Sequence, residues 1–365
     1  MNRKKEALTL EKKINLILEN GKIFEGKSFG REKEITGEIV FTTGMTGYFE
    51  TLTDPSYCGQ IVVQTFPLIG NYGIIEEDAE SRGSFVKAYI VREYCEHPSN
   101  YRCEGTLDEY LKKNDIPGVY GIDTRELTRV LREHGTMKAK ITSEPVKENE
   151  KIDVEYFDMV EAVTCEESFT DKVEDAKYNV VLWDFGAKRN IRRELLKRGC
   201  NVTTVPASTT AEEIKALNPD GIMLSNGPGD PKDNVKIIEE LKELCKANIP
   251  TFGICLGHQL LALSQGGTTI KLKYGHRGGN QPVKDLSTGR IYVSSQNHGY
   301  AVDNDELPKN AELLFTNVND GTCEGIKYTD MPVFSVQFHP EACGGPQDTS
   351  YLFDRFISLM EGVEI

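Results

Sequence analysis

The sequence lacks any hydrophobic segment close to the roughly 20 residues that a membrane-spanning helix requires. Basic residues are also scarce, because 43 Lys and Arg stand against 57 Asp and Glu, for a formal net charge of −14. Such an acidic surplus disfavours binding to nucleic acid or to anionic lipid. We therefore expect neither a nucleic acid nor a membrane among the partners of this chain.

Sequence signals for disulfides, metal sites and targeting are missing as well. The nine cysteines form no C-x-x-C pair, and their odd number favours free thiols over a disulfide framework. Cys95 and Cys103 flank a histidine, but their spacing fits no usual zinc motif, so no metal is predicted. The N-terminal stretch has no long apolar core and contains Glu6 and Glu11, which transit peptides avoid. We expect a cytoplasmic chain.

The length of 365 residues exceeds the usual size of one hydrophobic core and predicts two domains. An acidic, glycine-free stretch at 143–178 marks the boundary between two kinds of pattern. We predict an N-terminal domain at 1–145, a linker at 146–177 with room for one short helix, and a C-terminal domain at 178–365. The N-terminal domain is predicted to be β-rich and mixed, with strands at Glu38–Thr42, Gln60–Thr65 and Ser84–Val91 and helices at Thr106–Asn114 and Thr124–His134.

Beyond the boundary, strands and helices alternate with short joints, which indicates an α/β domain with a mostly parallel sheet covered on both faces. The predicted strands are Asn179–Phe185, Asn201–Val205, Gly221–Ser225 and Pro250–Ile254, and the predicted helices are Lys188–Arg198, Thr210–Leu217, Asn234–Ala247 and Leu256–Gln265. The remainder is strand-rich, with a hairpin at Asn319–Gly321 and a closing helix at Thr349–Met360.

A cysteine lies at the sharpest motif of the chain, Gly253-Ile-Cys255-Leu-Gly257, where an apolar strand turns into a helix. This is the cysteine counterpart of a nucleophile elbow, in which glycines are needed because both sides of the turn crowd neighbouring elements. Unpaired N–H groups and the dipole at the helix N-terminus favour a thiolate, and the N–H of Leu256 can face an oxyanion. The alternative, a buried structural cysteine, leaves the flanking glycines without a purpose.

A candidate base follows a second β-rich run, Phe334-Ser-Val-Gln-Phe-His339-Pro-Glu341. Residues two apart in an extended chain face the same side, so Glu341 can orient the imidazole of His339. Pro340 holds the segment extended. By itself this motif would be interpreted as an exposed strand-end histidine, but together with the elbow it predicts a Cys–His–Glu triad.

A glycine- and proline-rich loop, Ser225-Asn-Gly-Pro-Gly-Asp-Pro231, follows a predicted strand. Loops at the carboxyl ends of strands are where open α/β sheets bind ligands. The N–H groups of Gly227 and Gly229 could therefore complete an oxyanion hole or hold a substrate amide. An ordinary turn is the competing interpretation.

These three motifs, in this order, resemble those of class I glutamine amidotransferase domains, and the resemblance extends from Asn179 to the end. The first half resembles the N-terminal domain of the carbamoyl-phosphate synthase small chain. The segments that carry the second resemblance are Phe41–Tyr48, Thr53–Tyr57, Pro67–Gly73 and Gly121–Thr128. Asp184–Asn190 and Ser295–Gly299 also match that family.

The resemblance implies a role for each matching residue. Cys255 would attack the carboxamide of L-glutamine, His339 would carry the proton and Glu341 would orient His339, while Gly227 and Leu256 would bind the oxyanion. Positions that would bind the amino-acid part of glutamine are Ser56, Gln259, Asn297, Gly299 and Tyr300. Tyr300 replaces the usual Phe, and Cys343-Gly344-Gly345 replaces Ser-Pro-Gly, which puts a second thiol, interpreted as a bystander, near the triad.

The resemblance also implies a partner, a separate large subunit that uses ATP and bicarbonate to make carbamoyl phosphate for arginine and pyrimidine synthesis. The N-terminal domain is the expected contact with that subunit. No Gly-x-x-x-x-Gly-Lys-Ser/Thr loop occurs here, so no cofactor is predicted in this chain, and ATP and Mg²⁺ are expected on the large subunit. The alternatives are an amidotransferase subunit of another synthase, a non-catalytic scaffold and a cysteine hydrolase acting on other amides.

Overall fold

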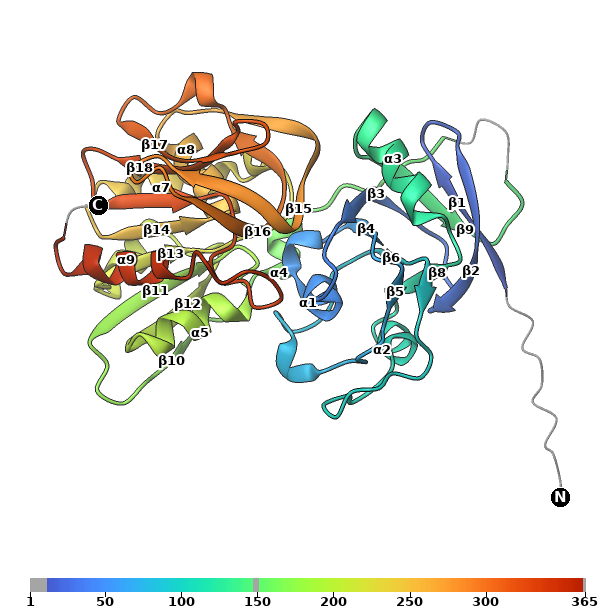
Figure 1. Ribbon diagram of the computed structural model, residues 1–365. Helices are drawn as coiled ribbons and strands as arrows, with labels where there is room; N and C mark the ends of the chain where they lie inside the picture. Colours follow the sequence, from blue (N-terminus) through green and yellow to red (C-terminus); the bar gives the residue numbers. More distant parts are fainter. Residues whose placement is uncertain (1–11, 147–150, 364–365) are drawn as a thin grey trace. The chain divides into compact units, whose positions relative to one another are not determined.

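The computed structural model describes residues 12–146 and 151–363, which form two compact units (Figure 1). The barrel unit comprises the described parts of Met1–Phe41, Gln60–Ile75 and Val86–Glu155. The sheet unit comprises Thr42–Gly59, Glu76–Phe85 and the described part of Tyr156–Ile365. Two short segments from the first half of the sequence thus belong to the second unit. Residues 1–11, 147–150 and 364–365 of the three predicted domain ranges lie outside the described residues.

The barrel unit is a closed barrel with the strand order β1-β2-β8-β6-β4-β3-β9. Its strands are β1 (Lys13–Leu18), β2 (Ile23–Gly30), β3 (Ile35–Thr42), β4 (Gln60–Gln64), β6 (Ala88–Ile90), β8 (Pro117–Tyr120) and β9 (Met137–Thr142), and a small pair is formed by β5 (Leu68–Ile69) and β7 (Glu93–Tyr94). The antiparallel pairing of β1 with β9 closes the barrel. The β-rich character of this half is confirmed, although the predicted strand Ser84–Val91 shortens to β6.

Both helices predicted for the barrel unit are present, as α2 (Leu107–Lys113) and α3 (Thr124–His134). Thr106 and Glu109 form a reciprocal capping box at the start of α2. The side chain of Asp123 accepts the N–H of Glu126 at the start of α3, and the helix stops at Gly135, where φ is 95°. Local capping chemistry therefore decided where these helices begin and end.

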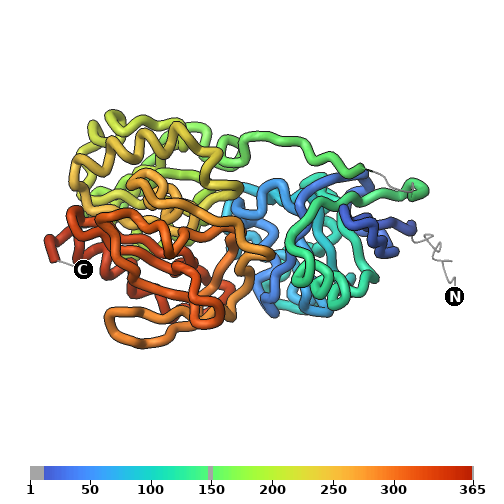
Figure 2. Tube along the Cα trace, turned by 90° about the horizontal axis from the view of Figure 1, so that it is seen from above, coloured from blue at the N-terminus to red at the C-terminus, as the bar shows by residue number. Residues whose placement is uncertain are grey.

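The sheet unit contains a ten-stranded mixed sheet with the order β10-β12-β11-β13-β14-β19-β18-β17-β15-β16. Its strands are β10 (Phe169–Asp171), β11 (Tyr178–Asp184), β12 (Cys200–Pro206), β13 (Gly221–Leu224), β14 (Thr251–Ile254), β15 (Thr269–Asp285), β16 (Ile291–Val302), β17 (Ala311–Asn317), β18 (Cys323–Tyr328) and β19 (Val333–Val336). The run β12-β11-β13-β14-β19 is parallel, which confirms the predicted α/β class. The long hairpin β15–β16 forms the far edge of the sheet (orange in Figure 2).

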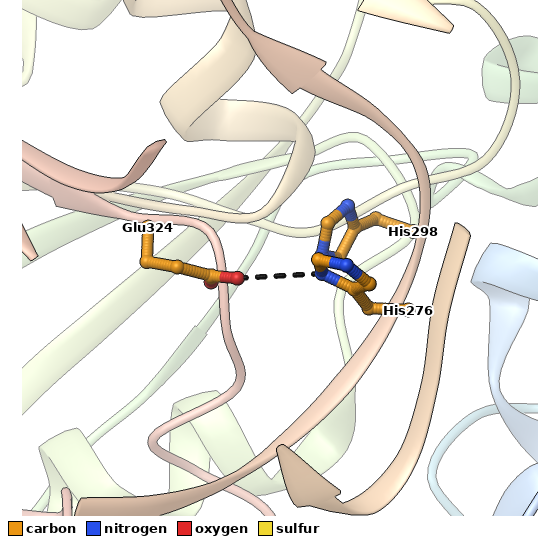
Figure 3. Close-up of side chains that lie close together, drawn as sticks. All are labelled: His276, His298 and Glu324. Atoms are coloured by element: carbon orange, nitrogen blue, oxygen red, sulfur yellow. Dashed lines mark ion pairs between the residues drawn. The ribbon is translucent and has the colours of Figure 1, made fainter. Parts of the chain in front are cut away.

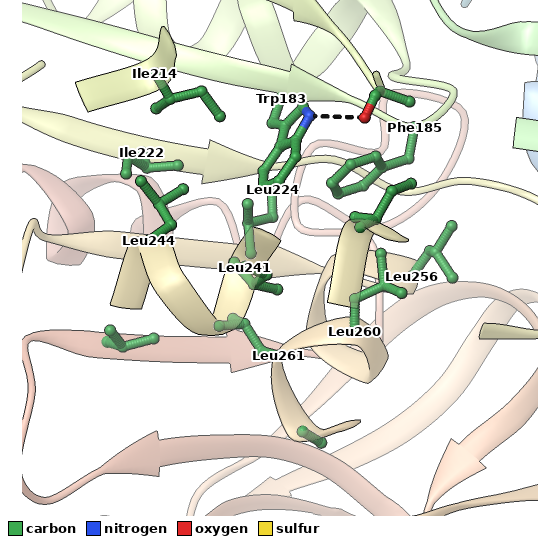
Figure 4. Close-up of a cluster of buried hydrophobic side chains, with 14 of the residues drawn as sticks. Trp183, Phe185, Ile214, Ile222, Leu224, Leu241, Leu244, Leu256, Leu260 and Leu261 are labelled. Atoms are coloured by element: carbon green, nitrogen blue, oxygen red, sulfur yellow. Dashed lines mark hydrogen bonds between the residues drawn. The ribbon is translucent and has the colours of Figure 1, made fainter. Parts of the chain in front are cut away.

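Helices cover both faces of this sheet. They are α5 (Arg189–Lys197), α6 (Ala211–Ala216), α7 (Val235–Cys245), α8 (Leu256–Ser264) and α9 (Tyr351–Met360), within a few residues of the predicted bounds. One core cluster packs α6, α7 and α8 against the sheet, and its aromatic centre is Trp183, whose indole donates to the carbonyl of Ala207 (Figure 4). The other packs α5 and α9 on the opposite face. Alternate residues of β11 enter the two clusters, because strand side chains alternate in direction.

The remaining short elements lie in the sheet unit. These are α1 (Tyr48–Thr53), α4 (Met159–Val163) and the 3₁₀ turns Pro55–Tyr57, Glu76–Asp78, Pro231–Asp233 and Asn304–Glu306. The helix α4 is the short helix expected in the acidic stretch, but β10, which pairs with β12, was not predicted there. The hairpin predicted at Asn319–Gly321 joins β17 to β18. No helix in the described part of the chain is long and apolar enough to cross a bilayer.

Candidate active site

Cys255 directly follows β14 and forms the N-cap of α8 with a φ of 53° and a ψ of −102°. A non-glycine residue in such a sparsely populated region costs on the order of 1–3 kcal/mol, and strain of this kind concentrates at functional sites. A Cβ on Gly253 would lie 2.8 Å from the Leu261 side chain, and one on Gly257 would lie 2.7 Å from the Leu224 carbonyl oxygen. The predicted need for both glycines of the elbow is therefore confirmed.

The thiol of Cys255 is buried and has two polar neighbours. Its Sγ lies 3.7 Å from the carbonyl oxygen of Asn297, to which the S–H can donate. The amide Nε2 of Gln337 lies 3.6 Å from the same sulfur and can donate to it. Cys255 is also the N-cap residue of α8, where backbone N–H groups lack helical partners. The sulfur therefore has an amide donor beside it and belongs to the residue that begins a helix.

The predicted contact between His339 and Glu341 is present. The imidazole Nδ1 lies 2.7 Å from Glu341 Oε1, and both side chains are buried. An N–H at Nδ1 donating to that carboxylate leaves Nε2 unprotonated and able to accept a proton. Among the described residues, Nε2 has no hydrogen bond of normal geometry, but Cys255 is close enough to influence the charge of the ring.

A buried lysine joins this pair and was not identified from the sequence. The Nζ of Lys188, just before α5, lies 3.7 Å from Glu341 Oε1 and 3.3 Å from Asp54 Oδ2. Burial lowers the pKa of Lys188, but Asp54, Glu341 and Glu80 raise it by a larger amount. The net pKa of Lys188 is therefore raised. Lys188 lies in the Asp184–Asn190 segment that matched the family, and that was its only signal in the sequence.

These charges set the protonation of the pair. Burial raises the pKa of Glu341, but His339 and then Lys188 lower it by more, so the carboxylate stays ionised. Burial and Lys188 lower the pKa of His339, whereas Glu341 and Cys255 raise it by more, so its net pKa is raised. The arrangement therefore favours an imidazolium at His339 next to an ionised Glu341.

Two predicted oxyanion donors lie side by side. Gly227 follows β13, directly beside the strand that carries Cys255. A Cβ on Gly227 would lie 2.6 Å from the Leu256 side chain and would also strike the carbonyl oxygen of Phe185, so only glycine fits. Gly229 has a φ of +89°, and a Cβ there would lie 3.6 Å from the sulfur of Met159.

The predicted glutamine-binding residues gather from three segments of the sheet unit, namely the turn Pro55–Tyr57, α8 and β16. Gln259 on α8 donates to the carbonyl of Tyr300 over 2.7 Å. Ser56 accepts a hydrogen bond of 2.9 Å from Asn226, which precedes Gly227. The side-chain amide of Asn297 donates to Asp54 over 3.0 Å, and the backbone carbonyl of Asn297 faces Cys255. Gly299 lies on the same strand, between Asn297 and Tyr300.

Bulges bend the hairpin that carries three of these residues. The pairing of β15 with β16 shifts register between Lys271 and His276 and again between Gly278 and Gln281. Bulges bend a strand and redirect its side chains, often beside active sites. The backbone N–H of His339 donates to the carbonyl of Ser295 on β16 over 2.9 Å. The hairpin at the edge of the sheet thereby reaches the elbow on β14.

A cavity of about 380 Å³ adjoins this group. Its lining includes Asp54, Lys188 and Asn297, and it continues along the segments 42–47, 278–280 and 342–345. Cys343 also lines it and donates to Glu80 over 3.2 Å. Burial and then Glu80 raise the pKa of that thiol to about 12, which makes it a poor nucleophile at neutral pH.

His276 on β15, His298 on β16 and Glu324 on β18 form a buried cluster (Figure 3). His276 Nε2 lies 2.9 Å from Asp320, and its Nδ1 lies 3.4 Å from Glu324. His298 Nδ1 lies 2.7 Å from the Tyr300 carbonyl, and its Nε2 lies 3.1 Å from Gln296 Oε1. Both nitrogens of both rings thus have protein partners, through ion pairs at His276 and hydrogen bonds at His298, and these contacts account for the cluster. That the chain binds no metal stays a prediction.

The sequence is similar to known proteins along most of its length. Residues 181–359 match the family model described as glutamine amidotransferase class-I, and residues 16–141 match the carbamoyl-phosphate synthase small chain, CPSase domain. The chain is 53% identical to the carbamoyl phosphate synthase small chain of Clostridium perfringens over 349 residues, covering 94% of this chain and 99% of the relative. It is 51% identical to that of Oceanobacillus iheyensis over 361 residues, covering 97% and 98%. The chain therefore belongs to the carbamoyl phosphate synthase small chain family and contains a class I glutamine amidotransferase domain.

Proposed function

We propose that this chain hydrolyses L-glutamine at Cys255 and supplies the released ammonia to a separate large subunit of carbamoyl-phosphate synthase. The observation that carries the proposal is the strained, buried Cys255 at a helix N-terminus next to the hydrogen-bonded pair of His339 and Glu341. A nucleophile, a base and an orienting carboxylate in this order are the parts that acyl transfer requires.

Each step follows from the positions of these groups. His339 takes the thiol proton, and the thiolate of Cys255 attacks the carboxamide carbon of glutamine. The N–H groups of Leu256 and Gly227 stabilise the oxyanion that forms. The intermediate collapses to a thioester as His339 protonates the departing ammonia. Water, activated by His339, then hydrolyses the thioester to glutamate and restores the thiol.

The substrate is held by its amino-acid end, at a distance from the bond that breaks. We assign this role to Ser56, Gln259, Asn297, Gly299 and Tyr300. For Gly229 we propose no direct role beyond its place in the loop that also carries Gly227. Binding at a remote end fixes the carboxamide beside the sulfur and so turns binding energy into correct orientation.

We further propose that the cavity next to Lys188 is the route by which ammonia leaves. Its lining includes polar side chains, among them Thr43 and Ser295, that can hydrogen-bond a small molecule, and it adjoins Asn297, whose backbone carbonyl faces the sulfur. The large subunit binds ATP and Mg²⁺ and makes carbamoyl phosphate for arginine and pyrimidine synthesis. The N-terminal domain is the proposed contact with that subunit, in the cytoplasm.

Two alternatives make different predictions. An amidotransferase serving another synthase would have the same triad, but residues 16–141 match the small-chain domain, which favours carbamoyl-phosphate synthase. A non-catalytic scaffold has no need for a strained cysteine beside a buried histidine, and the strain at Cys255 therefore favours catalysis.

The first experiment compares Cys255→Ala with Cys343→Ala. We expect Cys255→Ala to lower glutamine hydrolysis by at least about a thousandfold and to prevent the adduct with a glutamine-analogue electrophile. Cys343→Ala should still form that adduct, and mass spectrometry should locate it at Cys255. Hydrolysis by Cys255→Ala at the wild-type rate would disprove the mechanism. Adding the large subunit should raise glutaminase activity, and an unchanged rate would count against a coupled pair.

A further inference from the structure

Three side chains on β19 and in the segment directly after it approach α8 or its N-cap residue, Cys255. They are those of Ser335, Gln337 and His339. Ser335 contacts His258 over 2.8 Å, Gln337 contacts the Cys255 sulfur and His339 lies beside it. The motif analysis used His339 but gave Gln337 no role. Its side chain nevertheless touches the atom that would attack the substrate.

A carbonyl determines the orientation of the Gln337 amide. The carbonyl of Tyr300 can only accept, so the group of Gln259 that lies 2.7 Å away must be its NH₂. The same NH₂ lies 2.9 Å from the Gln337 side chain, which must therefore present its oxygen. The NH₂ of Gln337 is then the end that faces Cys255, at 3.6 Å. The Tyr300 carbonyl thus fixes which end of each glutamine amide is the NH₂, although oxygen and nitrogen of an amide are otherwise easily interchanged.

Burial makes this hydrogen bond important for the charged form of the sulfur. Gln337 is fully buried, and its two partners, Cys255 and Gln259, are nearly so. Where water is excluded, a hydrogen bond to an ion is stronger than one between neutral groups. The thiol can donate to the Asn297 carbonyl, but a thiolate is repelled by that oxygen. The thiolate therefore needs donors, and the Gln337 amide is one.

We propose that Gln337 is a further catalytic residue, whose amide N–H stabilises the Cys255 thiolate and holds the sulfur in position for attack. The inference rests on the proposed glutaminase function. It deepens that function, because Gln259, which is assigned to the substrate, also positions the amide of Gln337. The nucleophile and the amino-acid subsite are thus joined by two buried amides.

The experiment follows the thiolate directly, without using turnover. In the full-length chain, iodoacetamide alkylation of the Cys255 peptide is measured by mass spectrometry across pH for wild type, Gln337→Met and Gln337→Glu. Met keeps the length of the side chain but has no donor. Glu keeps an acceptor for Gln259 but places a carboxylate beside the sulfur. Ser335→Ala is the matched control, because it alters a side chain two residues away whose hydroxyl hydrogen-bonds to His258.

For Gln337→Met we expect the pH of half-maximal alkylation to rise by about one unit, and the rate at neutral pH to fall about tenfold. Gln337→Glu should shift the profile further in the same direction, because like charges repel. In both variants kcat for glutamine should fall while KM changes less than about threefold. Ser335→Ala should keep the wild-type alkylation profile.

Unchanged alkylation profiles in both Gln337 variants would overturn the inference. So would a large rise in KM without a shift of the profile, because Gln337 would then act only by supporting Gln259. If Gln337→Met fails to fold, the isosteric Gln337→Glu decides the question alone. Failure of the inference is separate from failure of the proposed function, since full hydrolysis by Cys255→Ala tests only the latter.

Discussion

The barrel unit and the sheet unit bury different kinds of side chain. Among the described residues of the barrel unit, the buried polar side chains are uncharged, namely Gln64, Thr124 and Thr142. The sheet unit buries charged groups, among them Asp54, Glu80, Lys188, Glu324 and Glu341. Burying a charge costs several kcal/mol unless partners compensate for the lost water. The buried charges of the sheet unit are therefore better explained by a chemical role of these residues than by stability alone.

The largest predicted difference between the units concerns histidines. His339→Asn should lower glutamine hydrolysis by about 10²–10⁴-fold, because the base and acid of the proposed mechanism is lost. His134→Asn, at the exposed end of α3 in the barrel unit, should leave the rate within about twofold of wild type. Steady-state glutaminase assays on both variants check this pair. Equal losses would show that His339 acts through general stability.

The next largest difference concerns lysines. Lys188→Met should lower the free energy of unfolding of the sheet unit by about 3–5 kcal/mol, because Asp54 and Glu341 are left buried without their cation. Lys112→Met in the barrel unit breaks only an exposed pair with Asp108 and should cost about 0.5 kcal/mol or less. Denaturant unfolding followed by the fluorescence of Trp183, the single tryptophan, reports on the sheet unit. A cost below about 1 kcal/mol for Lys188→Met would contradict the comparison.

Glycines offer a third contrast. Gly257→Ala should destabilise the sheet unit by about 1–3 kcal/mol, because a Cβ there strikes the Leu224 backbone. It should also reduce glutamine hydrolysis, since the elbow must shift. Gly105→Ala in the barrel unit meets only the distal carboxylate of Glu109, at 3.7 Å, and should change stability by about 0.5 kcal/mol or less. Thermal unfolding and activity of the two variants provide the measurement.

The smallest expected effect is on the pH dependence of stability. The pKa of Glu341 is lowered in the fold, mainly by His339 and then Lys188 against the effect of burial, so its stabilisation is present above the unfolded pKa. It is lost as pH falls through the folded value. The pKa of His339 is raised, so its contribution is present below the unfolded pKa and is lost as pH rises through the folded value. The free energy of unfolding of wild type, followed by Trp183 fluorescence, should therefore decrease both as pH falls through the folded pKa of Glu341 and as pH rises through that of His339.

Glu341→Gln is the variant that tests this pH dependence. It removes the acidic titration and the main group that raises the pKa of His339, so both slopes should flatten. The barrel-unit variant Glu126→Gln removes an exposed carboxylate and should keep the slopes of wild type. Slopes unchanged by Glu341→Gln would show that other groups control the pH response.

Much of the sheet unit could be predicted because its elements follow local patterns. Alternating apolar residues defined β11, and the turn glycines around Cys255 marked the elbow. The barrel was harder, because β1 closes it by pairing with β9, which lies more than a hundred residues further along the chain. The periodicity of a strand shows which face is buried but not which strand lies beside it. The short edge strand β10 was missed because it is largely exposed and has no apolar alternation.

Local sequence patterns were limited in the same way for the candidate active site. The sequence alone determined the strained turn at Cys255 and the proximity of His339 to Glu341, because both depend on a few consecutive residues. Only the tertiary structure placed Lys188 against Asp54 and aimed the Gln337 amide at the sulfur. The physical reason is that the pKa of a buried charge and the direction of a buried hydrogen bond depend on partners from distant segments. Those partners become neighbours only when the sheet is assembled.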